Sequence, residues 1–154
     1  MRALIQRVNK VKVEIKGQTL SQINKGFLVL LGVKQEDTEA DGDFLVEKIA
    51  NLRVFGDEKD KMNLSLLDIK GEVLVVSQFT LYADCRRGRR PDFIDAAKPE
   101  LAQELYKKFI QRFKATGLHV CEGEFGAMMD VELVNSGPVT IMLDTAEIQI
   151  SKLK

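Results

Sequence analysis

Four residues that could take part in catalysis stand together where a buried strand is expected to end. Residues 73–76, Val-Leu-Val-Val, form a short continuous apolar run, which is typical of a strand covered on both faces. Directly after it come Ser77, Gln78, Phe79 and Thr80, which bring hydroxyl, amide and backbone N–H groups to the strand end. Backbone N–H groups placed in this way can stabilise an oxyanion, and one such donor is worth roughly 3 kcal/mol. These four residues are therefore the candidate catalytic residues.

Few other residues could supply acid–base or metal chemistry. His119 is the only histidine, and it alternates with apolar neighbours in a strand-like run, so a Ser-His-Asp triad is not supported. No clustered Cys and His residues suggest a zinc site, and we expect neither a metal ion nor a cofactor. Paired carboxylates, as in glycoside hydrolases, stay open on composition alone, although Asp84 is the only acid within residues 77–84. A hydrolase built on these residues would work without strong acid–base side chains.

A second unusual segment lies about 55 residues later, where a Gly-Pro step separates two strand-like runs. Residues 135–140 read Asn-Ser-Gly-Pro-Val-Thr. From the dipeptide alone, a tight turn is the simpler interpretation, and a cis bond is not predicted because only about 5–6% of X-Pro bonds in folded proteins are cis. Glycine would also suit a place where the backbone comes close to a ligand, since it has no Cβ.

Composition indicates one ordinary globular domain. The chain has 154 residues, of which 45% are apolar and 30% charged, and its 23 basic residues balance its 23 acidic ones. Such a balance argues against a long basic face that grips nucleic acid, and we expect no DNA partner. No apolar run approaches the length needed to span a membrane, and the first residues lack the pattern of a signal peptide. We expect a cytoplasmic protein whose two cysteines, Cys85 and Cys121, are free thiols.

The pattern of elements predicts an α+β fold, with a largely antiparallel, barrel-like curled sheet and two main helices packed on it. Thr38 and Asp41 form a candidate capping box for the first helix, and Pro99 suits the first turn of the second. We assign residues 1–145 to a single domain. Residues 146–154 form an extension of unknown role, in which residues 147–154 alternate as a strand would. The other strand-like runs are residues 3–15, 26–33, 53–55, 73–76, 118–121, 129–134 and 139–143.

The segment at the predicted strand end, residues 77–84, and the Gly-Pro segment, residues 135–140, together resemble the D-aminoacyl-tRNA deacylase family. The resemblance covers about residues 1–145, and its motifs occur in the same order: RVNKVKVEI, KMNLSLLD, SQFTLYAD, GRRPDF, FGAMM and GPVTIMLD. It implies a hydrolase that releases D-amino acids from the 3′ end of mischarged tRNA, and that also deacylates glycyl-tRNA. It further implies a homodimer whose active sites are shared across the interface.

The family resemblance also implies roles for particular residues. The backbone around Phe79 and Thr80 would supply oxyanion donors. Gly137 and Pro138 would form a Gly-cisPro element that enters the partner subunit's pocket, captures the substrate α-amino group and rejects an L side chain. Arg7 would hold that element in position. Two further residues would line the pocket for the terminal adenosine, although without the resemblance they would be assigned to the core: Phe125 and Met129.

Three alternatives remain open at this stage. In the family, Thr80 is either a nucleophile or a residue that orients the ester while the substrate 2′-hydroxyl assists water, and the absence of an evident base favours orientation. Within the hydrolases, an enzyme that edits small L-amino acids is the rival. In another class, residues 86–90 (Arg-Arg-Gly-Arg-Arg) could belong to a non-catalytic nucleic-acid-binding module, a solvated loop, or a phosphate contact that guides an RNA terminus.

Overall fold

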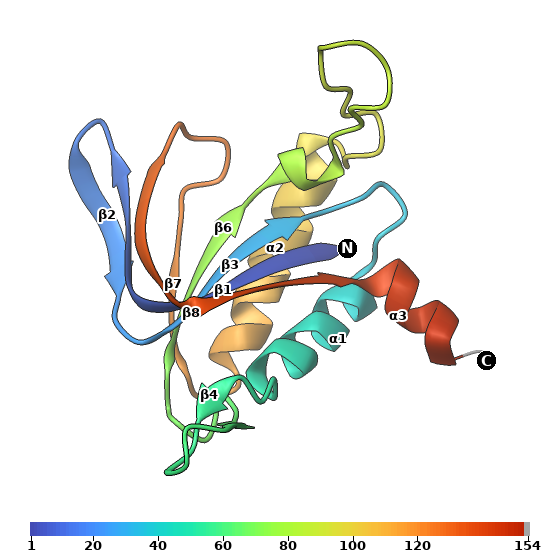
Figure 1. Ribbon diagram of the computed structural model, residues 1–154. Coiled ribbons are helices and arrows are strands. Elements are labelled where there is room, and N and C mark those ends of the chain that lie inside the picture. Colours follow the sequence, from blue (N-terminus) through green and yellow to red (C-terminus); the bar gives the residue numbers. More distant parts are fainter. Residues whose placement is uncertain (153–154) are drawn as a thin grey trace.

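The computed structural model describes residues 1–152, and the side chains of residues 1–148, as one six-stranded sheet with helices packed against it (Figure 1). This arrangement confirms the predicted α+β class. The sheet strands are β1 (Arg2–Ile15), β2 (Gln18–Ile23), β3 (Gly26–Gly32), β6 (Glu72–Ser77), β7 (His119–Glu122) and β8 (Asp130–Asp144). A small separate hairpin consists of β4 (Phe55–Gly56) and β5 (Met62–Leu64). The helices are α1 (Glu39–Ala50), the short 3-10 helix η1 (Phe79–Tyr82), α2 (Pro99–Lys114) and α3 (Thr145–Lys152).

The sheet is curled and is mixed in direction. Strand β1 pairs antiparallel with β2, β3 and β8, whereas β6 runs parallel to both β3 and β7. Strands β3, β6 and β7 therefore present their carboxyl ends at one edge of the sheet. Polar residues that follow these strands gather at that edge.

Both predicted main helices are present, and each begins at the residues that predicted its start. The Thr38 backbone N–H donates to the Asp41 carboxylate at 2.9 Å, which satisfies one of the free donors at the start of α1. Helix α2 begins at Pro99, a residue whose missing N–H is not needed in the first helical turn. Both helices pack on the same face of the sheet (Figure 1).

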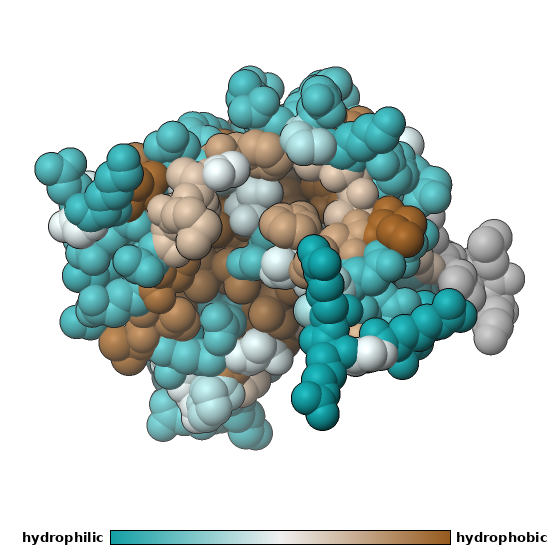
Figure 2. Space-filling view, turned by 90° about the horizontal axis from the view of Figure 1, so that it is seen from above, coloured by the Kyte–Doolittle hydropathy of each residue, from teal (hydrophilic) through white to brown (hydrophobic). Residues whose placement is uncertain are grey.

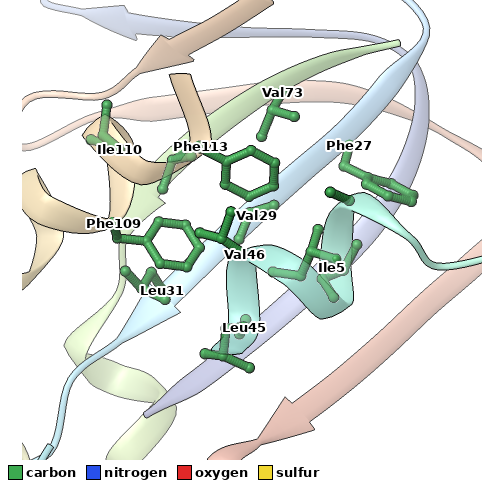
Figure 3. Close-up of a cluster of buried hydrophobic side chains, with 14 of the residues drawn as sticks. Ile5, Phe27, Val29, Leu31, Leu45, Val46, Val73, Phe109, Ile110 and Phe113 are labelled. Atoms are coloured by element: carbon green, nitrogen blue, oxygen red, sulfur yellow. The ribbon is translucent and has the colours of Figure 1, made fainter. Parts of the chain in front are cut away.

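Strand β6 lies between two apolar clusters, as its continuous apolar run predicted. Val73 and Val75 contribute to the cluster beneath α1 and α2, while Leu74 and Val76 point into a second cluster on the other face of the sheet. Figure 3 shows the first cluster, in which aromatic rings of α2 cover β3 and β6. Because both faces of β6 are buried, the strand end at Ser77 has little freedom to move.

The strand-like alternation of residues 147–154 does not give a strand in the part of this segment that the structure describes. Residues 145–152 form helix α3, which begins where the Asp144 carboxylate accepts a hydrogen bond from the Ala146 N–H at 3.0 Å. A short alternating run does not outweigh such a cap, since Asp is among the residues that favour a helix start. Residues 153 and 154 lie outside the described residues. None of the described helices is long and apolar enough to cross a membrane.

Candidate active site

A cavity of about 660 Å³ opens at the edge where the parallel strands end. Its wall is mainly apolar and carries a few polar groups, the usual composition of a small-molecule site. Figure 2 looks onto this end of the molecule and shows brown, hydrophobic surface in a hollow bordered by hydrophilic side chains. Five of the predicted site residues line the cavity: Ser77, Gln78, Phe79, Phe125 and Met129.

The strand end supplies two free backbone donors at this cavity. The Gln78 N–H donates to the Leu31 carbonyl of β3 at 2.8 Å, which fixes the last ladder position. The chain then turns into η1, whose first N–H groups have no earlier carbonyl to bond. Accordingly, no described residue accepts a hydrogen bond from the N–H of Phe79 or Thr80. Both residues are exposed, so an incoming carbonyl oxygen could reach these donors.

The Thr80 hydroxyl is held by a neighbour that cannot act as its base. The Gln78 side-chain amide donates a short hydrogen bond to the Thr80 Oγ1. An amide N–H donates a hydrogen bond to the oxygen and cannot accept a proton from it. The sole histidine lies on β7, where His119 Nε2 contacts Cys121 Sγ at 3.3 Å. The geometry therefore matches a hydroxyl that is oriented, and it provides no activated nucleophile.

An aromatic pair forms the rim of the cavity. The rings of Phe79 and Phe93 meet edge to face with centroids 5.0 Å apart, and both residues line the cavity. Phe79 nevertheless remains 54% exposed, which is unusual for so large an apolar side chain. Phe93 was not among the predicted site residues, and the only signal for it was its place within the GRRPDF motif.

A tyrosine on α2 anchors the opposite wall. The buried Tyr106 hydroxyl donates to the Val75 carbonyl at 2.9 Å and also lies 3.4 Å from the Gly123 carbonyl. Its ring contacts that of Phe125 at 5.9 Å, and burial raises the pKa of its phenol. The hydroxyl thus joins strand β6 to the segment that carries Phe125 and Met129. Tyr106 was not among the predicted site residues, because nothing in the sequence pattern of its helix indicates a buried hydrogen bond.

The Gly-Pro segment forms a wide bulge in β8. Gln6 pairs with Thr140 and Val8 with Asn135, so only Arg7 of β1 stands opposite residues 136–139. The peptide bond between Gly137 and Pro138 is cis. Within the bulge, the Asn135 side chain accepts from the Val139 N–H at 3.2 Å and donates to the Thr140 hydroxyl at 2.9 Å. These bonds brace the bulge from inside.

Arg7 clamps the bulge from the neighbouring strand. Its Nε donates to the Ser136 carbonyl at 3.1 Å, and its Nη1 donates to the Val54 carbonyl. Gly137 has a φ of +117° and packs so closely that a Cβ placed there would lie 2.6 Å from Arg7 Nη2. A larger residue would therefore meet both a strained backbone and a blocked space.

The bulge and the cavity are separate parts of one chain. Arg7 and Ser136 line a second cavity of about 370 Å³, whereas Gly137 and Pro138 are exposed at the surface. Neither of these two cavities, nor a third of about 240 Å³, is lined by both the strand end at Ser77 and the bulge at Gly137. One chain thus brings Ser77, Gln78 and Phe79 to the same cavity as Phe125 and Met129. Thr80 follows Phe79 in η1 and does not line this cavity, and the predicted chirality element lies apart from it.

The described residues near the cavity do not form a metal site. Among the described residues, no group of three or more His, Cys, Asp or Glu side chains is arranged to hold an ion. Asp84, the first acid after the strand end, is bound to the Arg86 guanidinium at 2.6 Å. This pair lowers the pKa of the Asp84 carboxyl to about 2, so the group stays ionised at neutral pH. It is therefore a poor proton donor.

Comparison with known proteins gives consistent results over nearly the whole chain. The family model described as D-Tyr-tRNA(Tyr) deacylase matches residues 4–144. The D-aminoacyl-tRNA deacylase of Clostridioides difficile is 58% identical, with 96% of this chain and 99% of the relative covered. The protein of the same name from Thermus aquaticus is 57% identical, with 96% and 97% covered.

Two solved structures share the fold. One, titled c-Myc DNA Unwinding Element Binding Protein, superposes with a TM-score of 0.89 at 42% identity and covers 94% of this chain and 99% of its own. The other, titled as a structural analysis of a probable eukaryotic D-amino acid tRNA deacylase, has a TM-score of 0.81 over 93% of this chain and 98% of its own. At 16% identity, the second supports the fold alone.

Proposed function

We propose that this chain, which belongs to the D-Tyr-tRNA(Tyr) deacylase family, hydrolyses the ester bond of D-aminoacyl-tRNA and also that of glycyl-tRNA. The observation that carries the proposal is a pair of free N–H groups, one on Phe79, which lines an apolar cavity, and one on the next residue, Thr80. An aminoacyl ester is already an activated acyl group. A site that orients it and stabilises the developing oxyanion can hydrolyse it without a strong base.

In this mechanism, the ester carbonyl lies against the two free N–H groups. Water attacks the carbonyl carbon, and negative charge develops on the carbonyl oxygen, where the donors of Phe79 and Thr80 stabilise it. Collapse of the tetrahedral intermediate expels the tRNA 3′-oxygen, which takes up the proton that the attacking water gives up and leaves as a hydroxyl. The substrate 2′-hydroxyl assists the water, and Thr80, fixed by Gln78, orients the ester. No covalent bond to the enzyme forms.

The apolar wall suits the terminal adenosine. Phe125 and Met129 offer an aromatic face and an adaptable thioether, and the Tyr106 hydroxyl holds their segment against β6. Gly123 lets Met129 approach closely, since a Cβ at that glycine would lie 2.9 Å from the Met129 Sδ. The cavity volume of about 660 Å³ falls within the usual range for small-molecule sites.

Chirality is read, in this proposal, by a second subunit. The bulge of one chain lies outside that chain's own catalytic cavity, yet Gly137 and Pro138 are exposed and rigidly clamped by Arg7. A two-fold dimer would insert each bulge into the partner's cavity reciprocally. There its backbone would capture the α-amino group and exclude an L side chain. Glycine carries no side chain, so glycyl-tRNA would also be accepted.

Parallel deacylation assays test the reaction. Protein treated with EDTA should hydrolyse D-tyrosyl-tRNA and glycyl-tRNA while leaving L-tyrosyl-tRNA almost untouched. Preferred cleavage of small L-aminoacyl-tRNA would instead support the editing enzyme. Binding of tRNA without any hydrolysis would support a non-catalytic module. Activity that depends completely on added zinc would contradict a site made of orienting groups and backbone donors.

Mixed dimers test the shared site. Thr80→Trp should block the cavity and Gly137→Trp should spoil the bulge, so each homodimer should be inactive. In a mixed dimer, one site carries both lesions and the other carries none, and about half of the wild-type activity per dimer should return. If both elements serve the site of their own chain, verified subunit exchange will restore nothing.

A further inference from the structure

Residues 85–91, which we call the arginine loop, project from the rim of the cavity and have no part in the hydrolysis described above. Two backbone hydrogen bonds between Asp84 and Asp92, of 2.7 and 2.9 Å, close the base of the loop. The next residue, Phe93, packs on Phe79 and lines the cavity. The base of the loop is therefore fixed relative to the place where the ester would be cleaved.

The charges of this loop divide into one paired and three unpaired arginines. Arg86 is bound to Asp84 through its Nε and Nη2, at 2.6–3.0 Å, and this pairing helps to close the base of the loop. Arg87, Arg89 and Arg90 are all exposed, and none forms an ion pair with a described residue. Three positive charges thus stand together outside any ion pair of the described residues, and the next acids in the chain are Asp92 and Asp95.

The backbone spreads these arginines around the tip of the loop. Gly88 has a φ of +69°, and a Cβ placed there would meet nothing within 4 Å. The loop therefore turns in open space, with an arginine on each side of the turn. In Figure 1 the loop extends beyond the end of the sheet after η1, and Figure 2 shows strongly hydrophilic side chains standing out from this end of the molecule.

Exposed apolar side chains occur just after the loop in the chain and along the cavity from whose rim the loop projects. Ile94, which follows the loop, is 81% exposed, Met128 on the cavity wall is 91% exposed and Phe79 is 54% exposed. Positive charge that tracks a backbone, next to apolar and aromatic surface for bases, is the usual composition of a surface that holds single-stranded nucleic acid. A solvated loop would need neither its closed base nor these neighbours.

We propose that Arg87, Arg89 and Arg90 bind backbone phosphates of the tRNA acceptor arm while the aminoacylated 3′ end occupies the cavity. The inference rests on the proposed function, because the cavity must receive the 3′ end for the loop to meet the adjoining nucleotides. Guanidinium groups suit this task, since their planar donors match phosphate oxygens bidentately. Such contacts position the substrate and do not read its sequence.

Two substrates that differ only in their phosphates separate docking from chemistry. The triple variant Arg87→Gln, Arg89→Gln, Arg90→Gln should lose about tenfold or more in kcat/KM on D-tyrosyl-tRNA. On 3′-O-D-tyrosyl-adenosine, which has no phosphate, the same variant should match the wild type within about twofold. The corresponding triple lysine variant should recover part of the activity on tRNA, because it keeps the charges but not the bidentate donors.

The salt dependence of kcat/KM should change if the loop binds phosphates, but not if the loop has a purely structural role. A plot of log kcat/KM against log salt should be shallower in the triple glutamine variant by about 2–3, because each lost phosphate contact removes a slope of about 0.7–0.9. The matched control removes three exposed lysines near the opposite end of the molecule, Lys59, Lys61 and Lys70, by substitution with Gln. This control removes the same net charge and should leave both the slope and the rate on tRNA unchanged.

The possible outcomes separate the docking proposal from the proposed function. Equal losses on tRNA and on the adenosine ester would show that the loop shapes the cavity and would overturn docking, as would no loss on tRNA. A wild-type protein inactive on both substrates would refute the proposed function. In that case, fluorescence anisotropy with an uncharged acceptor-arm hairpin still tests the loop, which should bind it more weakly in the glutamine variant. Equal competition by a DNA duplex of the same length would contradict specific docking of an acceptor arm.

Discussion

The cavity and the bulge are built in different ways. The cavity is assembled from segments far apart in the chain: the end of β6, the segment before β8, and the start of α2. The bulge is local, because residues 135–140 are braced by Asn135 and clamped by a single side chain from the adjacent strand. A cavity lined by several distant segments should tolerate a small change at one residue. A local and tightly clamped bulge should lose its function when a single methyl group is added. Four predictions test this difference.

The largest effect is expected from one methyl group in the bulge. Gly137→Ala places a Cβ 2.6 Å from Arg7 Nη2 and 3.0 Å from Val139 Cγ2, at a φ of +117°. We expect kcat/KM on D-tyrosyl-tRNA to fall by about 100-fold or more, and the free energy of unfolding to fall by about 1–3 kcal/mol. Gly17→Ala is the matched control, since Gly17 also has a positive φ, of +78°, but open space around it. If both variants lose activity equally, the close approach to Arg7 is irrelevant.

Loss of the Thr80 hydroxyl should have a smaller effect, because the backbone donors remain. We expect Thr80→Ala to lower kcat by about 10- to 100-fold, which corresponds to about 1.4–2.7 kcal/mol of barrier. Thr80→Ser keeps the group that Gln78 holds and should retain most of the activity. Removal of the substrate 2′-hydroxyl should cost more than Thr80→Ala. An acyl-enzyme on Thr80, detected by mass spectrometry, would show that the residue is a nucleophile.

The Tyr106 hydroxyl tests how far the cavity wall depends on one anchor. Tyr106→Phe keeps the ring against Phe125 and leaves the Gly123 carbonyl without this donor. Chemical denaturation should show a loss of about 1–3 kcal/mol, the usual cost of an unsatisfied buried group. KM should rise by a few-fold while kcat changes little, because in the proposed function the wall holds the adenosine and does not touch the ester. A fall in kcat alone would contradict this division.

The smallest effect is expected at the Asp84–Arg86 pair. The folded pKa of Asp84, about 2, lies below its ordinary value of 3.8 because Arg86 stabilises the ionised form. A lowered pKa means that the pair stabilises the fold fully above the ordinary pKa, and that this contribution is lost as pH falls from there through about 2. An NMR titration should therefore give a midpoint near 2, and Arg86→Gln should return it towards 3.8. Activity between pH 5 and 8 should not respond to this group.

Sequence patterns predicted the cavity better than the bulge, and the reason is physical. An apolar run that stops at Ser77 marks the end of a buried strand, and both faces of β6 are indeed buried. The approach of Arg7 to Ser136 depends on pairing between strands more than 100 residues apart, which periodicity does not encode. Only the family resemblance indicated Arg7.

Other misses have similar causes. Tyr106 stands in an apolar helical stripe, and its polar role appears only when the carbonyls of Val75 and Gly123 lie beside it. The parallel direction of β3, β6 and β7 is set by how the intervening helices cross the sheet, so the mixed character of the sheet did not follow from strand patterns alone. Helix α3 was missed because a cap at Asp144 outweighs a brief alternation.

The bulge also bears on the solubility of the folded chain. Strand β8 pairs with β1 along one side and with no other described strand, so its outer side is a sheet edge that could recruit a strand from another molecule. Residues 136–139 break that edge near its middle, and Pro138 has no N–H to offer to an added strand. Regular β-extension and the aggregation that follows from it are thereby blocked at the same position that carries the Gly-Pro step.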